Sequence, residues 1–207
     1  MDTDADTLVI DSRSVGDPAR FLTLEHLERA LAALADGPRD EGRVVLIVRK
    51  ADGGRRETPH RVRLTPEDGV PGDAWGRRHN PNPETQLAVM ERQVAELVAD
   101  GQPLALFGDN LVLDLDLSRE NLPVGSRLRV GGATLEATPI PHTGCKKFHA
   151  RFGADALRFV SKPELRHRNL RGIYLRTVEA GEVAVGDPVA VVSRPAPEGP
   201  PDGSALD

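Results

Sequence analysis

The sequence predicts a mainly β domain with a few small helices, arranged as a barrel or a sandwich. After residue 103 the chain consists largely of short apolar runs separated by Gly, Asp, Asn and Pro, a pattern typical of many short strands. Two segments, 123–130 and 184–191, share the same order of turn and strand, with Gly125 and Gly186 at the turns. The 207 residues suffice for one domain with a real core, and 3% aromatics leave that core to Val, Leu and Ala.

The N-terminal part of the chain predicts one helix and a hairpin. Thr23 can cap a helix over 24–34, whose leucines recur at spacings of three and four, and Gly37-Pro38 follows it. Residues 43–50 predict a strand. A Gly-rich turn follows, so residues 61–65 are expected to pair back on that strand.

The middle of the chain predicts a long loop and a second helix. Residues 66–83 are rich in Pro, Gly, Asp and Asn, and a loop of this length in a compact domain indicates function. Asn82-Pro83-Glu84 is typical of a helix start. The expected core face of that helix is Leu87, Met90, Val94, Leu97 and Val98.

The remaining elements are mostly strands around one short helix. The expected helix spans 148–160, and the expected strands span 104–107, 111–115, 127–130, 133–138, 173–178, 183–185 and 189–192. We therefore expect three parts: an acidic segment 1–61 packed on the barrel, the barrel domain 62–194, and a disordered tail 195–207.

The charge pattern points to an anionic ligand. Residues 1–41 hold ten acids against four arginines, whereas residues 140–178 hold nine basic residues against two acids. A basic region in a chain of net charge −5 favours an anionic ligand there, and the alternative is a solvated surface balanced by nearby acids. The single cysteine, the missing signal peptide and the missing apolar stretch of roughly 18 residues predict a cytoplasmic protein that does not engage a membrane.

The sharpest local feature is the segment Pro139-Ile-Pro-His-Thr-Gly-Cys-Lys-Lys-Phe148. Two of the four lysines of the chain directly follow its only cysteine, Cys145. Cationic neighbours and a following helix N-terminus favour the thiolate, which attacks electrophiles and binds metals. The alternative is a buried structural cysteine, but its neighbours here are polar. The spacing does not fit a zinc site, and a Cys145–His142 catalytic pair is only weakly indicated.

Around this cysteine the sequence resembles the MOSC domain, a family associated with the molybdenum cofactor. The resemblance runs from about Val62 to Val192. Its pieces, in order, are Gly72-Asp73, Gly108-Asp109-Asn110-Leu111, 123–128, 133–138, the cysteine segment, 172–176 and 181–187. Two departures suggest a changed pocket wall: Ala74-Trp-Gly-Arg-Arg-His79, where many members carry a His and paired glycines, and His142-Thr143-Gly144, where others have Arg or a second Pro.

The resemblance implies a β-barrel with small helices and a site built around Cys145. Cys145 would ligate molybdenum or carry sulfur as a persulfide. The residues implied to bind the cofactor's phosphate and pterin, or to line the pocket, are Asp73, Asn110, His142, Thr143, Lys146, Arg151 and Arg176. We also expect the loop 72–79 to fold over the cysteine and to offer Arg77 or Arg78 to an anion.

The implied function is enzymatic, either as a molybdenum-dependent reductase of N-hydroxylated compounds or as a sulfur transferase. A reductase needs a small-molecule substrate and an external electron donor. A sulfur carrier needs a separate cysteine desulfurase, because the chain is too short for the pyridoxal-phosphate domain of larger sulfurases. The alternative is a non-catalytic carrier or binding module for the cofactor. Nucleic-acid binding is not favoured, because the basic cluster 166–171 lacks interleaved aromatics.

Overall fold

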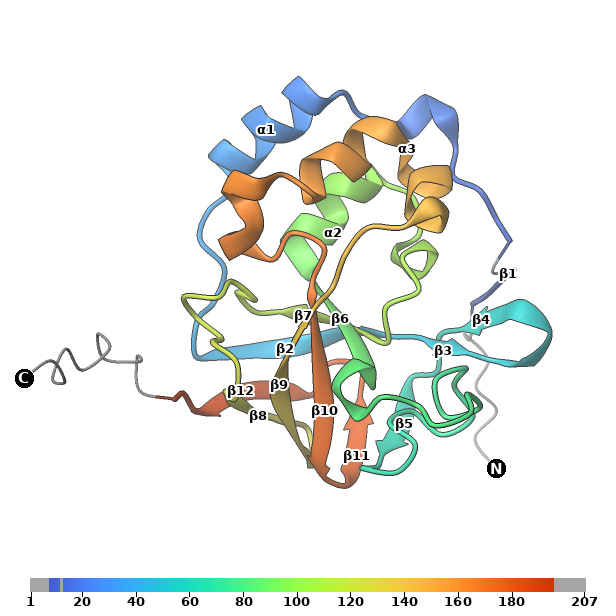
Figure 1. Ribbon diagram of the computed structural model, residues 1–207, viewed down its shortest axis with the longest axis vertical. Coiled ribbons are helices and arrows are strands. Elements are labelled where there is room, and N and C mark those ends of the chain that lie inside the picture. The colour runs from blue at the N-terminus through green and yellow to red at the C-terminus, as the bar shows by residue number, and fades with distance from the viewer. Residues whose placement is uncertain (1–7, 12, 196–207) are drawn as a thin grey trace, which may run out of the picture.

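The computed structural model describes residues 8–11 and 13–195 of the protein (Figure 1). Its strands are β1 (Val9–Asp11), β2 (Glu41–Ile47), β3 (Arg49–Lys50), β4 (Arg55–Glu57), β5 (Arg61–Leu64), β6 (Leu87–Glu91), β7 (Leu111–Asp114), β8 (Arg127–Val130), β9 (Ala133–Pro141), β10 (Ile173–Glu179), β11 (Gly181–Ala184) and β12 (Pro188–Ser193). Its α-helices are α1 (Leu24–Ala33), α2 (Arg92–Ala99) and α3 (Lys146–Val160). Short 3-10 helices cover Pro18–Arg20, Asp52–Gly54, Pro83–Thr85, Leu104–Leu106 and Pro163–Arg168.

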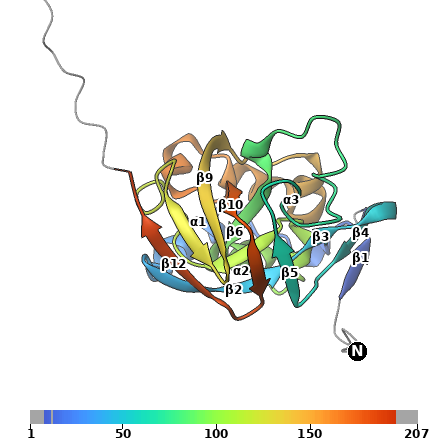
Figure 2. The same ribbon diagram turned by 90° about the horizontal axis from the view of Figure 1, so that it is seen from below.

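A closed barrel forms the centre of the molecule. Around it the described strands follow the order β10, β6, β7, β2, β12, β8 and β9, and β9 pairs with β10 to close the ring. All neighbours are antiparallel except β6 and β7, which are parallel. Figure 2 shows the ring from below. The predicted mainly β class and barrel are therefore confirmed.

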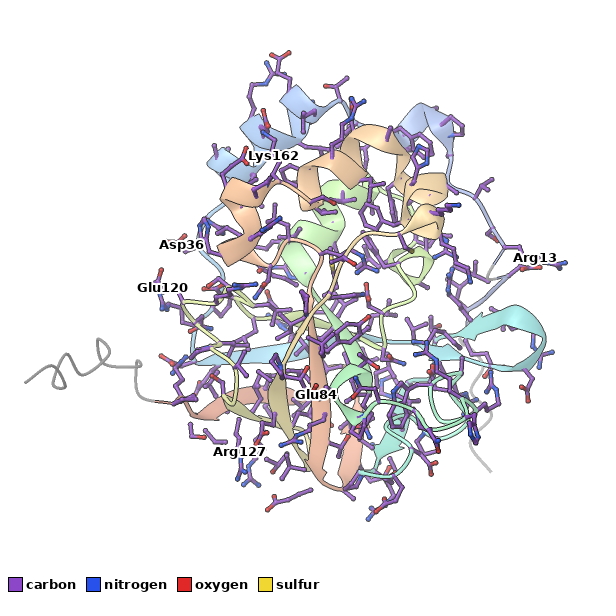
Figure 3. The ribbon with its side chains drawn as sticks, in the orientation of Figure 1. Arg13, Asp36, Glu84, Glu120, Arg127 and Lys162 are labelled. Carbon is purple, nitrogen blue, oxygen red and sulfur yellow. The ribbon has the colours of Figure 1, made fainter. Side chains whose placement is uncertain are left out.

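The barrel interior is aliphatic, as the composition predicts. Its buried cluster consists of Val, Leu, Ile and Ala, and the alternation along β8 shows how it is built. Leu128 and Val130 are buried while Arg127 and Arg129 are exposed, because successive side chains of a strand point to opposite faces. Charged side chains such as Arg13 and Arg127 project outward (Figure 3).

The two matching turn-and-strand segments are confirmed, and they lie side by side. β8 and β12 pair antiparallel, with Leu128 opposite Val191. The turn glycines Gly125 and Gly186 have φ of 86° and 90°. A side chain would be strained in this left-handed region, so glycine fits both turns.

Three helices cover one end of the barrel in Figure 1. α1 has the predicted cap, in which Thr23 Oγ1 accepts from the His26 N–H at 3.3 Å. Beneath the helices a second core gathers aromatic rings, with Phe107 and Phe152 stacked at 4.1 Å between ring centroids. The scarce aromatics therefore fill the helix–barrel interface and not the barrel.

The prediction of one helix from 83 to 98 is wrong in its first half. Asn82 caps only a 3-10 turn, and β6 then runs between β10 and β7 before α2 begins. Every residue of β6 is buried, so the strand lacks the alternation that would distinguish it from a helix in the sequence.

One other predicted strand and one predicted strand pairing are wrong. Leu104–Leu106 forms a 3-10 turn and not a strand. β5 pairs with β11, while the turn at Asp52–Gly54 joins β3 to β4. A local hairpin therefore exists, but with a nearer partner than the one expected.

The segment 1–61, expected to pack on the barrel, contributes a barrel strand. β2 lies between β7 and β12, so the ring is incomplete without it. The predicted tail 195–207 lies outside the described residues except for Pro195. Within the described ranges, no helix has both the length and the apolar character needed to span a membrane.

Candidate functional site

Cys145 lies in the connection from β9 to α3 and is exposed. It is the N-cap residue of α3, with extended backbone (φ −134°, ψ 175°), and its side chain makes no capping hydrogen bond. This exposure does not fit the alternative of a buried structural cysteine. The first N–H groups of a helix lack intrahelical partners. Because Cys145 is the N-cap residue of α3, these groups lie next to it.

Gly144 packs closely against a side chain of α3. A Cβ atom at Gly144 would lie 2.3 Å from Cδ1 of Leu157, a side chain of α3 itself. A larger residue here would require the Leu157 side chain to change its position.

A buried ionic cluster supports the connection from the barrel side. Asp109 and Arg171 are buried, and Arg171 Nη1 donates to Asp109 Oδ2 at 2.7 Å. His142 Nε2 lies 3.6 Å from the other oxygen of Asp109, and its ring packs against Tyr174 at 4.5 Å between centroids. The Arg171 guanidinium also lies over the Phe148 ring at 5.2 Å. The cluster joins the 108–110 turn, the cysteine connection and the start of α3.

The charges in this cluster follow from burial and pairing. Burial alone would raise the pKa of Asp109, but the charge of Arg171, its hydrogen bond and the charge of Lys50 hold that pKa below its ordinary value. Burial, and then the charge of Arg171, lower the pKa of His142 to about 3. At neutral pH the cluster therefore holds an Asp109–Arg171 ion pair and a neutral imidazole.

Asp73 and Asn110 form a second buried network with Lys50. Asp73 Oδ2 accepts from the Lys50 backbone N–H at 2.7 Å and from Asn110 Nδ2 at 3.1 Å, and Oδ1 accepts from the Trp75 N–H at 2.9 Å. Asn110 Oδ1 accepts from Lys50 Nζ at 3.0 Å. These two predicted cofactor residues are thus engaged within the protein, where they fix the loop 72–79 and position Lys50.

The loop 72–79 and the start of α3 share a cavity of about 230 Å³. Its walls include Ala74 and Arg77 from the loop, Lys147 from α3, and Lys50, Arg55 and Arg56. Arg77 donates to the Lys50 carbonyl at 2.9 Å and pairs with Asp52 at 3.0 Å. Arg78 is exposed, and its charge acts on Lys50 and Tyr174. Both loop arginines therefore lie on the side of the molecule that carries the cysteine cluster.

Two buried arginines complete the basic surroundings. Arg56 and Arg151 are each 4% exposed. Burial, and then the charge of Arg151, lower the pKa of Arg56 to about 10. Burial also lowers the pKa of Arg151, and the charge of Cys145 opposes that change, so Arg151 lies within electrostatic range of the thiol. Within the described residues, Arg56 Nε and Nη1 have no hydrogen-bond partner.

The remaining predicted residues, Thr143, Lys146 and Arg176, are exposed and lie outside the buried ionic cluster. Thr143 and Lys146 are exposed on either side of Cys145. Arg176 is exposed on β10 and pairs with Glu136 of β9, which also binds Arg127. The structure thus places Arg176 in an ion-pair group on the outer barrel wall, away from the residues gathered around the thiol.

One known family matches the part of the chain that contains the cysteine connection and most of the barrel strands. The model of the MOSC domain matches residues 76–190, more than half of the chain. This chain belongs to the MOSC domain family. The match begins after β2, so the barrel of this MOSC protein includes a strand from outside the matched range.

Solved structures resemble this MOSC protein in fold. A crystal structure described as that of a hypothetical protein has a TM-score of 0.57 at 20% identity, covering 75% of this chain and 70% of the other. The YuaD protein of Bacillus subtilis has a TM-score of 0.50 at 16% identity, covering 74% and 97%. YiiM from Escherichia coli has a TM-score of 0.49 at 22% identity, covering 75% and 72%. No curated protein matches the chain.

Sequence reasoning missed four residues of the site: Lys50, Arg56, Asp109 and Arg171. Asp109 directly precedes Asn110 in the Gly-Asp-Asn motif, so this motif could have indicated that Asp109 belongs to the site. Arg171 closes a basic run that the sequence gives no reason to bury. Arg56 follows an ordinary turn, and only the fold shows that it lies beneath Gly108, where a Cβ would come within 2.8 Å of its Nε.

Proposed function

We propose that this MOSC protein binds the molybdenum cofactor with Cys145 as the metal ligand or sulfur carrier. In this proposal it acts as a reductase of N-hydroxylated compounds or in sulfur transfer. The observation that carries the proposal is an exposed thiol at the N-cap of α3, flanked by the buried guanidinium of Arg151. A thiolate is a soft ligand suited to such a metal, and the cationic surroundings suit an anionic cofactor.

The residues present fit the cofactor in one further respect. A buried guanidinium with two nitrogen atoms that lack partners among the described residues is costly unless an acceptor reaches it. Arg56 borders the cavity that Lys50 and Lys147 also line. We therefore infer that these three residues hold the cofactor's phosphate, while Arg151 supports Cys145.

The protein's own residues would position and insulate the reacting group. The cofactor would supply the redox chemistry, and the chain supplies binding and orientation. The Asp109–Arg171 pair holds the cysteine connection against the barrel, so the sulfur stays on a rigid frame. Neutral His142 can exchange a hydrogen bond without adding charge, and burial raises the pKa of Tyr174, which keeps its hydroxyl protonated as a donor.

The reducing equivalents or the sulfur would come from other proteins. An external electron donor serves the reductase, and a cysteine desulfurase serves sulfur transfer. A cytoplasmic location would give the protein access to either partner.

Metal analysis tests the proposal. The full chain is purified from a host that makes the molybdenum cofactor, and molybdenum is measured by mass spectrometry. We expect about one molybdenum per chain in the wild type. A loss of most of it in Cys145→Ala identifies Cys145 as the metal ligand, because a metal–thiolate bond is removed, whereas retained molybdenum with lost sulfur transfer identifies it as the sulfur carrier. Arg129→Gln, which removes an exposed charge on β8 far from the sulfur in the sequence and lines none of the cavities described, serves as the control. Metal-free wild-type protein from that host would overturn the proposal.

A turnover assay then separates an enzyme from a carrier. Loaded protein is supplied with a chemical reductant and an N-hydroxylated amidine. Reduction that depends on Cys145 supports the reductase, whereas bound molybdenum without turnover, and without sulfur transfer from a desulfurase, favours the carrier.

A further inference from the structure

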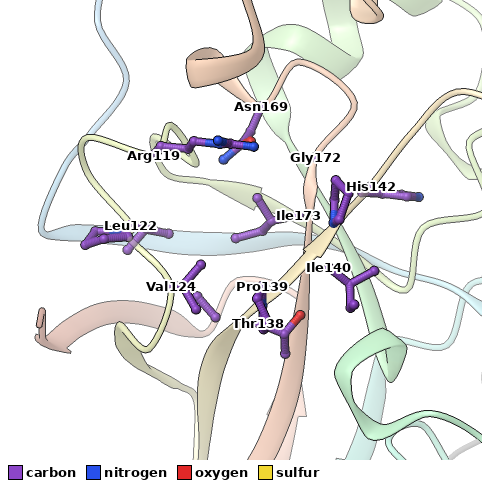
Figure 4. Close-up of a pocket in the computed structure, with 13 residues that line it drawn as sticks. Arg119, Leu122, Val124, Thr138, Pro139, Ile140, His142, Asn169, Gly172 and Ile173 are labelled. Atoms are coloured by element: carbon purple, nitrogen blue, oxygen red, sulfur yellow. The ribbon is translucent and has the colours of Figure 1, made fainter.

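A groove lies beside the cysteine connection, and Figure 4 shows the first of its two cavities. It consists of two cavities of about 270 Å³ each, which share the lining residues Arg119, Pro141, His142 and Asn169. We call the pair the Arg119 groove. Each cavity lies close to the lower end of the roughly 300–1,000 Å³ range of small-molecule pockets.

The walls of the Arg119 groove are largely apolar. In the first cavity Leu122 and Val124 from the loop before β8 face Ile173 at the start of β10 (Figure 4). Val124 is 55% exposed, although it is a large hydrophobic residue. An apolar ligand part seated here would remove this side chain from water, which is favourable in proportion to the area covered.

The groove is held in shape by hydrogen bonds of its own lining. Asn169 has left-handed backbone with φ of 48°, and its Nδ2 donates to the Leu117 carbonyl at 2.8 Å. The Thr138 hydroxyl donates to the Glu84 carbonyl at 2.7 Å. The Arg119 backbone N–H donates to the His167 carbonyl at 2.8 Å. A pocket that is formed in advance loses less entropy when it binds.

The charge of the groove has one sign. No Asp or Glu belongs to the described residues that line either cavity, although the chain has 32 acids against 27 lysines and arginines. Arg119 lines both cavities, and across the described ranges its side chain has no ion pair. The neighbouring Glu120 pairs with Arg39 at 2.9 Å instead. Figure 4 shows Arg119 extending toward Asn169, at the junction of the cavities.

We propose that the Arg119 groove binds an amphipathic organic anion. Its apolar, ring-sized part lies between Val124 and Ile173, and its carboxylate or sulfonate pairs with the Arg119 guanidinium. The second cavity of the groove also borders His142, Thr143 and Arg171, which belong to the cysteine connection and its ionic cluster. The proposed ligand contacts are Arg119, Val124 and Ile173, so the proposal does not depend on cofactor binding.

A fluorescence titration with a naphthalene sulfonate tests the proposal. The probe is 1-anilinonaphthalene-8-sulfonate, whose emission rises in an apolar site, added to the full wild-type chain. We expect saturable binding at one site that weakens at least about tenfold in Arg119→Gln, because a charge-assisted contact is lost. Arg119→Lys should retain most of the affinity. Arg129→Gln, an exposed arginine of β8 outside both cavities, is the matched control and should bind like the wild type.

A neutral analogue tests the role of charge. N-phenyl-1-naphthylamine has the same rings without the sulfonate, so its affinity should change less than about twofold in Arg119→Gln. Val124→Glu, which places an acid at the mouth, should weaken the sulfonate more than the amine. Near-UV circular dichroism must stay unchanged at saturation, which shows that the folded protein binds. Unsaturable binding, or equal affinities in Arg119→Gln and Arg129→Gln, would overturn the proposal.

Discussion

At the scale of single residues, the site combines one exposed thiol with charges that are almost fully buried. Cys145 is the part that its position in the sequence predicts, because two lysines follow it and a helix begins there. The buried members, Arg56 and the Asp109–Arg171 pair, depend on contacts between segments far apart in the chain. Local sequence patterns do not encode such contacts. For this reason the sequence predicts the thiol but not the buried charged residues around it.

The N-cap position of Cys145 leads to a stability prediction. Serine is a preferred N-cap residue because its hydroxyl accepts from an unpaired N–H, whereas the Cys145 side chain makes no such bond. Cys145→Ser should therefore raise the free energy of unfolding by about 0.5–1 kcal/mol, while Cys145→Ala should leave it within about 0.5 kcal/mol. Thermal melting of the metal-free proteins measures both. If both variants are destabilised by several kcal/mol, the side chain serves packing.

The unpaired N–H groups of Arg56 predict a gain in stability when the charge is removed. Arg56→Met keeps most of the apolar stem and eliminates a buried cation, so the metal-free protein should gain about 1–2 kcal/mol. The same change should reduce molybdenum retention. Urea unfolding and metal analysis report the two effects, with Arg129→Met, an exposed arginine outside this cavity, as the control. A loss of stability in Arg56→Met would mean that Arg56 holds the fold and not an anion.

At the scale of elements, the sequence predicts the alternating strands better than the buried one. β8 has polar residues on one face and apolar residues on the other, and its predicted bounds of 127–130 are those observed. β6 is buried on both faces, so its run of apolar residues joins that of α2 into one apparent helix. The error has a physical origin, since a central strand needs no polar face.

The junction of β6 and α2 carries a pH-sensitive carboxyl. Burial raises the pKa of Glu91 from 4.5 to about 7, although the Leu117 N–H donates to it, and Asp114 and Asp116 add to the rise while Arg168 opposes it. Between these two values the folded state keeps a proton that the unfolded state releases. The contribution of Glu91 to stability is therefore fully present below about 4.5 and is lost as the pH rises to about 7.

Replacing Glu91 by glutamine should remove this dependence. Glu91→Gln keeps an oxygen for the Leu117 N–H and cannot ionise, so its advantage in unfolding free energy over the wild type should be about 1–3 kcal/mol larger at pH 8 than at pH 5. Urea titrations at the two pH values measure the difference. Glu96→Gln, on the exposed face of α2, is the control. Equal differences at both pH values would contradict a buried, protonated Glu91.

At the scale of the whole molecule, the residue range that matches the family is shorter than the range that forms the barrel. The matched range 76–190 supplies β6 to β12, but β2 lies between β7 and β12 and comes from the segment expected to pack outside. The resemblance in the sequence weakens before Val62, so neither motif nor composition indicates that the ring needs this strand. Only the pairing of Leu46 with Val112 and of Val189 with Gly42 reveals it.

Removing residues 1–61 should therefore prevent folding. Without β2 the edges of β7 and β12 lose their hydrogen-bond partners, and the buried side chains of Val44 and Ile47 leave a gap in the barrel core. We expect the fragment 62–195 to lack the cooperative unfolding transition of the full chain and to aggregate, as gel filtration and far-UV circular dichroism would show. Co-expression with residues 1–61 should restore a folded complex, because the missing strand can pair in trans. The same co-expression with Val44→Asp in the short fragment should fail, since the pairing then buries an unpaired charge. A fragment 62–195 that folds cooperatively by itself would show that the barrel closes without β2.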